Sequence, residues 1–188
     1  MGRVLVLTGS PRLNGNTDRL AAAFAQGARL RHEVQTISVH HIRVHPCLGC
    51  NTCMTSEGNR CIREDDMDRV YEGLLWADTL LAASPVYFYG VSAQLKAVID
   101  RLHTPLRNRF SVRRLGLILV GAAELPDLFD PIITQYRMIL RFFSLQDAGM
   151  VLVRGAREKG DVGEADLRKA YELGAALEEV SDSFTDNL

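Results

Sequence analysis

Apolar runs alternate with helix-like segments along this chain, and the alternation restricts its fold more than any other feature of the sequence. Three runs are typical of strands buried on both faces, and another alternates apolar and polar residues as a strand near a sheet edge does. A short apolar run toward the C-terminus predicts a last strand. The predicted strands cover residues 4–7, 34–39, 79–83, 115–120 and 150–153.

After each of these strands, apolar residues recur at helical spacing and predict an amphipathic helix. Strands that alternate with helices must run parallel and be joined by right-handed crossovers, with helices on both faces of the sheet. We therefore predict an α/β fold, a doubly wound five-stranded parallel sheet with the flavodoxin-like strand order 2-1-3-4-5. A chain of 188 residues without repeats or linkers suits one domain, residues 1–188.

The loop between the first predicted strand and its helix, residues 9–17, has the composition of a phosphate site. Backbone N–H groups at a helix N-terminus are unpaired and attract anions, and glycine lets the backbone approach them closely. The loop lacks the Lys-Ser/Thr ending of a P-loop, the G-x-G-x-x-G of a dinucleotide fold and the cysteine of a phosphatase. A cofactor phosphate fits this pattern, and an ordinary polar turn is the alternative.

A second loop follows the third predicted strand and reads Ser-Pro-Val-Tyr-Phe-Tyr-Gly, residues 84–90. In such a sheet, ligands lie outside the carboxyl ends of the strands, beside strand one. Aromatic side chains and a glycine at that edge suit a flat heteroaromatic ring, although they could instead only pack against the following helix. Together the two loops indicate a mononucleotide of about the size of FMN.

The GSPR-x-x-GNT and SPVYFYG loops and the cysteine-rich stretch ending in Asp-Asp-Met resemble the NADPH-dependent FMN reductase family, close to its iron–sulfur flavoprotein branch. The resemblance implies an FMN-bound oxidoreductase that takes hydride from NAD(P)H and reduces free flavin, a quinone or a similar small-molecule acceptor. Because the flavin itself accepts hydride, no catalytic acid or base is expected. A flavin-binding structural or sensory module is a further hypothesis.

The same resemblance implies which residues contact the cofactor. A third contact loop is expected near residues 122–124. The phosphate ligands would be Ser10, Arg12, Asn14, Gly15, Asn16 and Thr17. The residues lining the isoalloxazine ring would be Pro85, Val86, Tyr87, Phe88, Tyr89 and Gly90.

Four cysteines within one short stretch indicate a site and not a disulfide framework. Three at C-x-x-C-x-x-C spacing and a fourth after a turn could cage a [4Fe–4S] cluster, as the resemblance also implies. A structural zinc ion, a redox dithiol of the first two cysteines, and reduced thiols packed over the flavin or a subunit contact are the alternatives. With a cluster, the chain would be an electron carrier served by a ferredoxin-like partner. The candidate metal ligands are Cys47, Cys50, Cys53 and Cys61.

Charge and hydropathy limit the expected partners. A net charge of −1 gives no basis for recruiting nucleic acid or anionic membrane, and no apolar run is long enough to cross a bilayer. The chain enters a strand at once, without a signal-peptide pattern, so we expect a cytoplasmic protein. The helix predicted after residue 131 carries Met138 and Phe142 off its main apolar face, which predicts a homo-oligomer, a dimer or tetramer. A solvated or subunit-facing basic loop, usable by a nicotinamide phosphate, is predicted at Arg107, Arg109, Arg113 and Arg114.

Overall fold

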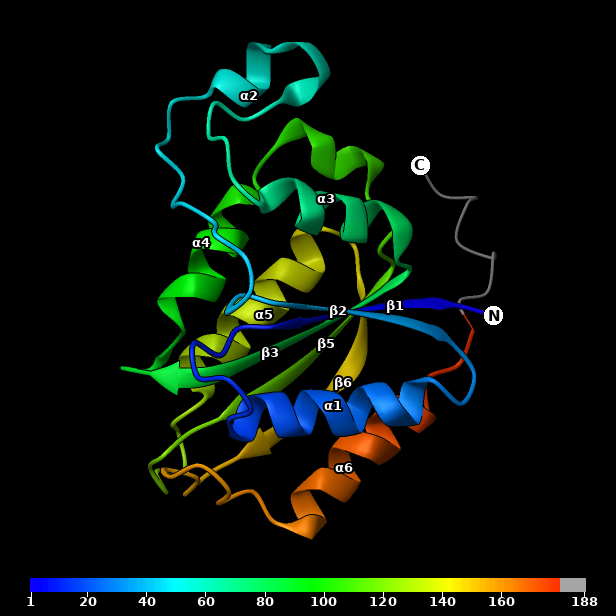
Figure 1. Cartoon of the computed structure of the whole chain (residues 1–188), viewed down its shortest axis with the longest axis vertical. Coiled ribbons are helices and arrows are strands. Elements are labelled where there is room, and N and C mark those ends of the chain that lie inside the picture. Colours follow the sequence, from blue (N-terminus) through cyan, green and yellow to red (C-terminus); the bar gives the residue numbers. More distant parts are fainter. Residues whose placement is uncertain (180–188) are drawn as a thin grey trace.

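The computed structural model describes residues 1–179; residues 180–188, the end of the predicted domain, lie outside the described part. One six-stranded sheet runs through the centre of the molecule (Figure 1). Its strands are β1 (Arg3–Thr8), β2 (Glu33–Ser38), β3 (Thr79–Tyr87), β4 (Gly90–Val91), β5 (Arg114–Val120) and β6 (Gln146–Val153). The α-helices are α1 (Asn16–Ala28), α2 (Thr52–Thr55), α3 (Met67–Trp76), α4 (Ala93–Arg101), α5 (Asp130–Phe142) and α6 (Glu164–Ala175), and the 3₁₀ helices are η1 (Glu57–Asn59) and η2 (Pro105–Arg109).

The sheet has the order β2-β1-β3-β5-β6, and these strands pair in parallel. The predicted flavodoxin-like order of the parallel strands is therefore confirmed. The remaining strand, β4, is an addition that the sequence did not predict. It pairs antiparallel with the end of β3, joining Val86 to Val91 and Tyr87 to Gly90, because β3 continues past residue 83 and turns back on itself.

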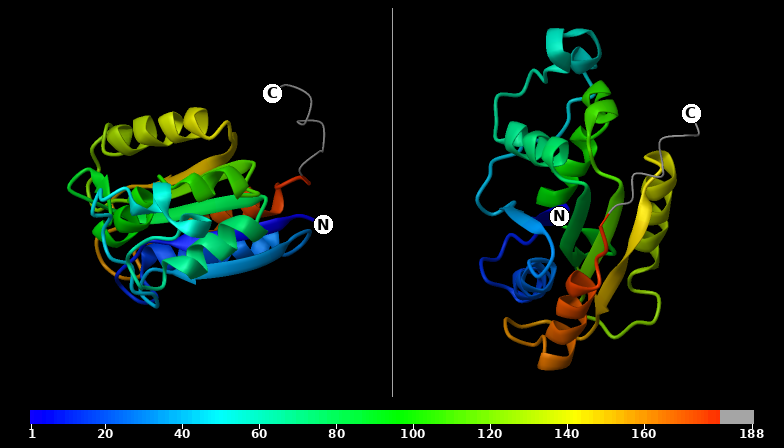
Figure 2. Two further views of the ribbon diagram at one scale, coloured as in Figure 1. Left: turned by 90° about the horizontal axis from the view of Figure 1, so that it is seen from above. Right: turned by 90° about the vertical axis from the view of Figure 1, so that its right-hand side faces the viewer.

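Helices cover both faces of the sheet, as the crossover rule requires (Figure 2). Val4 and Val6 of β1 pack toward α1 and α6, whereas Leu5 and Leu7 pack into the layer formed by α3, α4 and α5. Successive strand residues point to opposite faces, so a strand covered on both sides must be apolar throughout. This explains why β1 and β5 are continuous apolar runs in the sequence.

Helices α1 and α6 touch backbone to backbone. A methyl group added to Gly27 would lie 2.1 Å from the carbonyl oxygen of Tyr171, and one added to Gly174 would lie 2.1 Å from that of Phe24. Both glycines are buried in the last turn of their helix. Here the missing side chains allow the helices to cross in close contact beneath the sheet.

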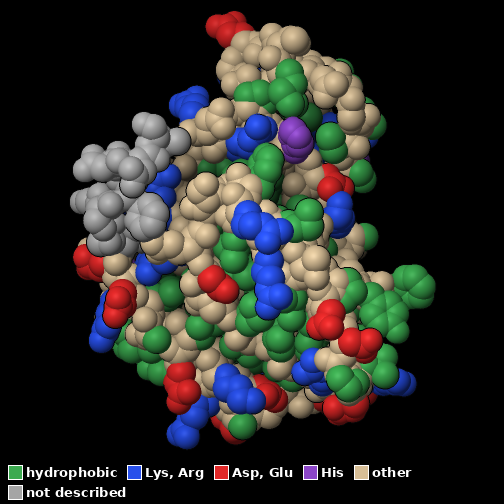
Figure 3. Space-filling view, turned by 180° about the vertical axis from the view of Figure 1, so that it is seen from behind, with side chains coloured by type: hydrophobic (Ala, Val, Ile, Leu, Met, Phe, Trp, Pro, Cys, Tyr) green, Lys and Arg blue, Asp and Glu red, His purple; other side chains and the backbone are tan. Residues whose placement is uncertain are grey.

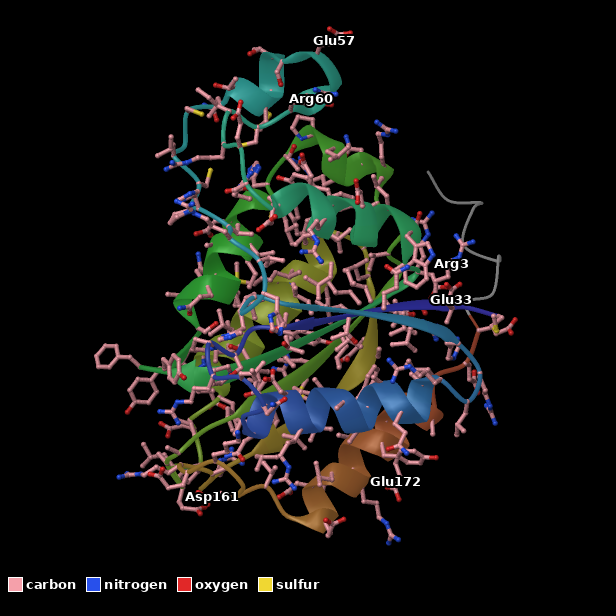
Figure 4. The ribbon with its side chains drawn as sticks, in the orientation of Figure 1. Arg3, Glu33, Glu57, Arg60, Asp161 and Glu172 are labelled. Atoms are coloured by element: carbon pink, nitrogen blue, oxygen red, sulfur yellow. The ribbon has the colours of Figure 1, made fainter. Side chains whose placement is uncertain are left out.

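Residues 46–64, which we call the cysteine segment, extend away from the sheet at one end of the molecule (Figure 1). Its two short helices, α2 and η1, contain no buried residue. Figure 4 shows the labelled Glu57 and Arg60 at the far tip of this segment, well away from the sheet. The segment therefore contributes almost nothing to the hydrophobic core.

One member of the predicted basic loop, Arg114, lies in the core and not in a surface loop. Arg114 is buried at the start of β5, where its Nε donates to Thr79 Oγ1 (3.2 Å) and its guanidinium lies beside Asp78. The sequence prediction was wrong because Arg114 begins a central strand, whose side chains are covered by helices on both faces. Among the described residues, no helix is long and apolar enough to span a membrane.

Candidate functional site

A cavity of about 190 Å³ lies where the carboxyl ends of β3 and β5 meet the N-terminus of α1. This is the sheet edge at which ligands bind in doubly wound folds. The predicted residues brought together in its wall are Ser10, Arg12, Gly15, Asn16, Thr17, Pro85, Val86 and Tyr87. The residues that sequence reasoning missed are Val120, Ala156, Arg157 and Lys159.

The N-terminus of α1 presents free backbone donors to this cavity. The first hydrogen bond of the helix joins the N–H of Arg19 to the carbonyl of Gly15 (3.0 Å), so the N–H groups of Asn16, Thr17 and Asp18 precede it. Gly15 occupies the N-cap position in extended conformation and has no side chain to occupy these donors. Unpaired N–H groups at the positive end of a helix dipole form an anion site.

Two buried hydroxyl groups flank these donors. Ser10 and Thr17 are both almost fully buried. The Oγ of Ser10 accepts the N–H of Arg12 (3.1 Å) and donates to its carbonyl (2.9 Å), which closes the loop tightly around the cavity. Asn14 adopts a left-handed conformation (φ 53°) in the same loop and lies outside the cavity wall.

The side chain of Asn16 holds the loop between β6 and α6 against the cavity. Its Nδ2 donates to the carbonyl of Glu158 (2.7 Å), and its Oδ1 accepts the N–H of Gly160 (2.9 Å). Asp161, labelled in Figure 4, braces the same loop by accepting the N–H of Glu158 (2.6 Å). The Asn16 amide thus positions the loop after β6, which carries Arg157 and Lys159 in the cavity wall.

Three basic side chains, Arg12, Arg157 and Lys159, line the cavity, and no acidic side chain is among its lining residues. Positive charge gathered along a cavity wall attracts anions, so this wall favours an anion. The rule that ligands collect at the carboxyl ends of strands could have pointed to the loop after β6 as well. The loops predicted to contact the cofactor follow the first, third and fourth strands only.

The predicted third loop is present at the cavity, since Ala122 contributes to its wall. The basic cluster of residues 107–114 lies elsewhere. Arg107 and Arg113 line a separate cavity of about 430 Å³ near the amino ends of β3 and β5, at the opposite edge of the sheet. A nicotinamide phosphate bound at the carboxyl edge would therefore not meet this cluster.

The aromatic loop forms the turn between β3 and β4. Phe88 (φ 50°) and Tyr89 (φ 63°) both have left-handed backbone conformations, which defines a tight two-residue hairpin turn of the kind that favours Asn-Gly. Phe88 is 98% exposed, and aromatic side chains project beyond the end of β3 (Figure 4). Exposed hydrophobic side chains also stand out at one edge of the face seen in Figure 3. Phe88, Tyr89 and Gly90 lie outside the cavity wall.

This turn costs conformational energy. A non-glycine residue in the left-handed region costs on the order of 1 kcal/mol or more, and both Phe88 and Tyr89 adopt this conformation. Strain of this kind at the rim of a cavity is often kept for function. The arrangement holds a large aromatic surface in water at the rim of the cavity.

The four cysteines are free thiols on the cysteine segment. Cys47 Sγ accepts the N–H of Gly49 (3.4 Å), and Cys61 Sγ accepts the N–H of Arg63 (3.5 Å). The hydroxyl of Thr52 donates to Cys50 Sγ (3.4 Å), and this hydrogen bond lowers the pKa of the Cys50 thiol. Within residues 1–179, however, no three His, Cys, Asp or Glu side chains are arranged as a metal site.

Comparison with known proteins agrees with this geometry. The family model for NADPH-dependent FMN reductase matches residues 2–177. An iron–sulfur flavoprotein of Archaeoglobus fulgidus is 30% identical over 183 residues, which are 94% of this chain and 79% of that protein. A Bacillus subtilis protein named as an NAD(P)H-dependent FMN-containing oxidoreductase is 30% identical over 182 residues, 93% of this chain and 94% of that one.

Solved structures share the fold. The NAD(P)H:quinone oxidoreductase from Methanothermobacter marburgensis superposes with a TM-score of 0.74 at 18% identity, over 94% of this chain and 99% of that one. This likeness supports the flavodoxin-like architecture, and the family match extends it to chemistry. The chain belongs to the NADPH-dependent FMN reductase family and is an FMN-binding, NAD(P)H-dependent oxidoreductase.

Proposed function

We propose that the cavity at the N-terminus of α1 holds the phosphate end of FMN and that the protein passes reducing equivalents from NAD(P)H to a small planar acceptor, such as free flavin or a quinone. The observation that carries this proposal is the set of free N–H groups of α1 facing a wall with three basic and no acidic side chains. Bound FMN supplies the hydride chemistry, and the chain supplies binding and electrostatics.

The size of the cavity supports a division between phosphate and ring. At about 190 Å³ it is smaller than the roughly 300 Å³ or more that a complete drug-sized ligand needs. It suits the phosphate and the adjoining chain, with Ser10, Thr17 and the α1 donors as ligands. The ring would then lie against the rim formed by residues 85–90, where apolar and aromatic surface is available.

The hairpin supports the choice of acceptor. Phe88 and Tyr89 offer exposed aromatic faces beside the proposed ring position. Flat aromatic molecules stack on such faces with little geometric demand. A planar acceptor of variable structure therefore fits this rim better than a polar aliphatic one.

FMN binding is tested by adding excess FMN to the purified protein, desalting it and recording the absorption spectrum before and after NADPH. We expect a yellow protein that NADPH bleaches anaerobically and that a quinone reoxidises. Thr17→Val keeps the side-chain shape and removes one buried hydroxyl, and it should weaken FMN binding by about ten- to hundredfold if that hydroxyl bonds the phosphate. Thr36→Val, on the edge strand β2, is the matched control. A protein that stays colourless would refute the proposal.

A second candidate function is that of an electron carrier in which the four cysteines also hold a [4Fe–4S] cluster and a ferredoxin-like protein exchanges electrons with it. Two observations favour it. Cys47 and Cys61 each accept a hydrogen bond from the N–H group of the residue two positions later in the chain. Such bonds stabilise thiolate sulfur and tune the reduction potential of a cluster. The Archaeoglobus relative is named an iron–sulfur flavoprotein.

Anaerobic reconstitution with iron and sulfide separates the two functions. The cluster hypothesis predicts about four iron and four sulfide per chain, and loss of both in Cys53→Ser and Cys61→Ser. Zinc bound in place of iron would support the structural alternative. A flavin-only spectrum with unchanged thiol content would leave the reductase function standing alone.

We further propose that the chain forms a homodimer or a higher homo-oligomer through α5. Met138 (57% exposed) and Phe142 (60% exposed) lie on its outer face, while Ile132 and Tyr136 are buried beneath it. An apolar stripe on the solvent side of a helix indicates a partner surface. Light scattering should show an oligomer that Met138→Glu with Phe142→Glu dissociates; a wild-type monomer would refute the proposal.

A further inference from the structure

The two ends of the cysteine segment are joined before it leaves the body of the fold. Arg43 and Asp66 exchange two hydrogen bonds: the N–H of Arg43 donates to Asp66 Oδ2 (2.7 Å), and the N–H of Asp66 donates to the carbonyl of Arg43 (3.0 Å). The N–H of His45 donates to Asp65 Oδ2 (2.8 Å). Residues 46–64 therefore form a closed excursion with a narrow stem.

A buried ion pair lies at the centre of this stem. The Asp65 carboxylate accepts from Arg101 Nη1 at 2.7 and 2.5 Å, and the two side chains are only 1% and 2% exposed. The same nitrogen reaches the carbonyl of His45 (3.5 Å). One guanidinium thus contacts the chain just before the first cysteine and just after the last one.

Hydrogen bonds to both oxygens of the Asp65 carboxylate stabilise its ionised form. The carboxylate also accepts the N–H of Met67 (3.2 Å), so Asp65 and not Asp66 makes the capping bond at the start of α3. Burial by itself would raise the pKa of Asp65, but the hydrogen bonds from Arg101, His45 and Met67 outweigh burial and lower the pKa. Removing either partner would leave a buried charge without compensation.

The helix that ends at Arg101 begins at the flavin loops. At the N-cap of α4, Ser92 Oγ donates to the carbonyl of Gly9 in the phosphate loop, and the N–H of Ser92 donates to Ser84 Oγ at the end of β3. A methyl group on Gly9 would lie 2.8 Å from the Cβ of Leu95, so loop and helix are in direct contact. Helix α4 is about 13 Å long at 1.5 Å per residue.

We infer that α4 is a strut that fixes the cysteine segment relative to the flavin site, and that Asp65 and Arg101 are the positioning residues at its far end. The segment has no hydrophobic anchor of its own, since α2 and η1 bury no residue. Apart from a small contact between η1 and η2, its placement rests on the stem. The stem contains Asp65–Arg101, the only fully buried ion pair among residues 1–179. Any role of this placement in electron transfer between the cysteine segment and the flavin depends on the proposed function. The tether between the segment and the sheet does not depend on it.

Hydrogen exchange of the whole protein tests the tether directly. In Asp65→Asn, the amides of residues 43–66 should exchange at least tenfold faster, while those of β1, β3 and β5 keep their wild-type rates. FMN affinity should stay within twofold, because the α1 donors and the N-cap of α4 are untouched. A uniform rise across the sheet would mean a merely structural role and would overturn the inference, as would unchanged exchange in the segment.

Two substitutions of Arg101 test whether its charge, and not only its side chain, holds the cysteine segment. Arg101→Lys retains a charge for Asp65 and should keep exchange of residues 43–66 within about threefold of wild type, whereas Arg101→Gln should match Asp65→Asn. The matched control is Asp100→Asn, which removes the exposed Lys96–Asp100 pair on the same helix and should change nothing. Equal effects of the Lys and Gln variants would contradict a role for the ion pair. A colourless protein with the predicted local exchange would refute the FMN proposal and leave the tether intact.

Discussion

The cavity at the N-terminus of α1 and the cysteine segment lie on the same protein but are built in opposite ways. Most of the cavity wall belongs to elements that also pack in the core, and the Asn16 side chain holds the exposed loop after β6 against it. The cysteine segment buries no residue of its short helices and depends on a polar stem. Core packing therefore positions most of the cavity, whereas a few directional bonds position the cysteine segment.

Because the two regions are held differently, we expect different substitutions and conditions to disturb them. Close-packed walls transmit any change of volume, so the cavity should respond to substitutions that are far from it in the sequence. A segment held by hydrogen bonds and an ion pair should respond to charge and pH, and it should open without unfolding the sheet. Substitutions in each region can test whether the two sites are independent.

The largest effect is expected from Gly174→Val at the crossing of α1 and α6. The new side chain would meet the Phe24 carbonyl at 2.1 Å, and backbone cannot move aside as a side chain can. Overpacking of this kind costs about 3 kcal/mol of unfolding free energy, which urea denaturation would measure. Because α1 would shift, FMN affinity should fall as well.

The control for this substitution is Gly163→Ser at the N-cap of α6, where a side chain meets open space and serine is a favoured cap. It should be neutral within about 0.5 kcal/mol. Equal stability of Gly174→Val and wild type would show that the helices can separate freely, and it would remove the contrast between a rigid cavity and a tethered segment.

The next effect is the acid sensitivity of the stem. The pKa of Asp65 is lowered in the folded protein, so its contribution is complete above the unfolded-state pKa of about 4 and is lost as the pH falls through the folded value. Hydrogen exchange of residues 43–66 in wild type and Asp65→Asn, followed from pH 7 to pH 3 and corrected for the intrinsic exchange rate, isolates the contribution of the Asp65 charge. The ratio of the two exchange rates should fall toward one at the acid end; a constant ratio would show that Asp65 is not ionised in the fold.

At the alkaline end, Tyr71 makes a smaller contribution at the same stem. Its hydroxyl donates to the carbonyl of Arg101 (2.9 Å), and burial raises its pKa to about 12. The neutral phenol therefore stabilises the fold below pH 10, and this stability is lost as the pH rises toward 12. Tyr71→Phe should cost about 1 kcal/mol at pH 7 and should reduce the alkaline loss, while Tyr136, whose pKa burial also raises, keeps its own contribution. A phenol absorbance that titrates near pH 10 in wild type and is missing from Tyr71→Phe would contradict the burial of Tyr71.

The smallest change in stability is expected at the hairpin rim of the cavity, and it should be a gain. Replacing Phe88 by Asn and Tyr89 by Gly supplies residues suited to positive φ and should stabilise the protein by about 1 kcal/mol. The same change removes the exposed aromatic faces, so NADPH-driven reduction of a quinone should slow. More stability with undiminished turnover would show that the aromatic turn serves something other than the acceptor.

The sequence by itself determined the sheet and half of the cavity. Apolar runs such as those of β1 and β5 fix strands that must be covered on both faces, and the loop of residues 9–17 carries its own helix start and glycine. These are local properties, because periodicity and helix-terminus chemistry act between near neighbours. The predicted parallel sheet is confirmed, and the loop of residues 9–17 contributes to the wall of the cavity.

Only the tertiary structure decided which distant residues meet. Asn16 holds the loop carrying Arg157 and Lys159 against the cavity at the N-terminus of α1, and Asp65 pairs with Arg101 across 36 positions in the chain. No pattern in the sequence marks these pairs, because each depends on how crossover connections bring separate elements to one edge. The cysteine spacing shows the converse: it is local and regular, yet within residues 1–179 the fold does not arrange those side chains as a metal site. Local periodicity specifies elements, and packing of the whole chain specifies contacts between them.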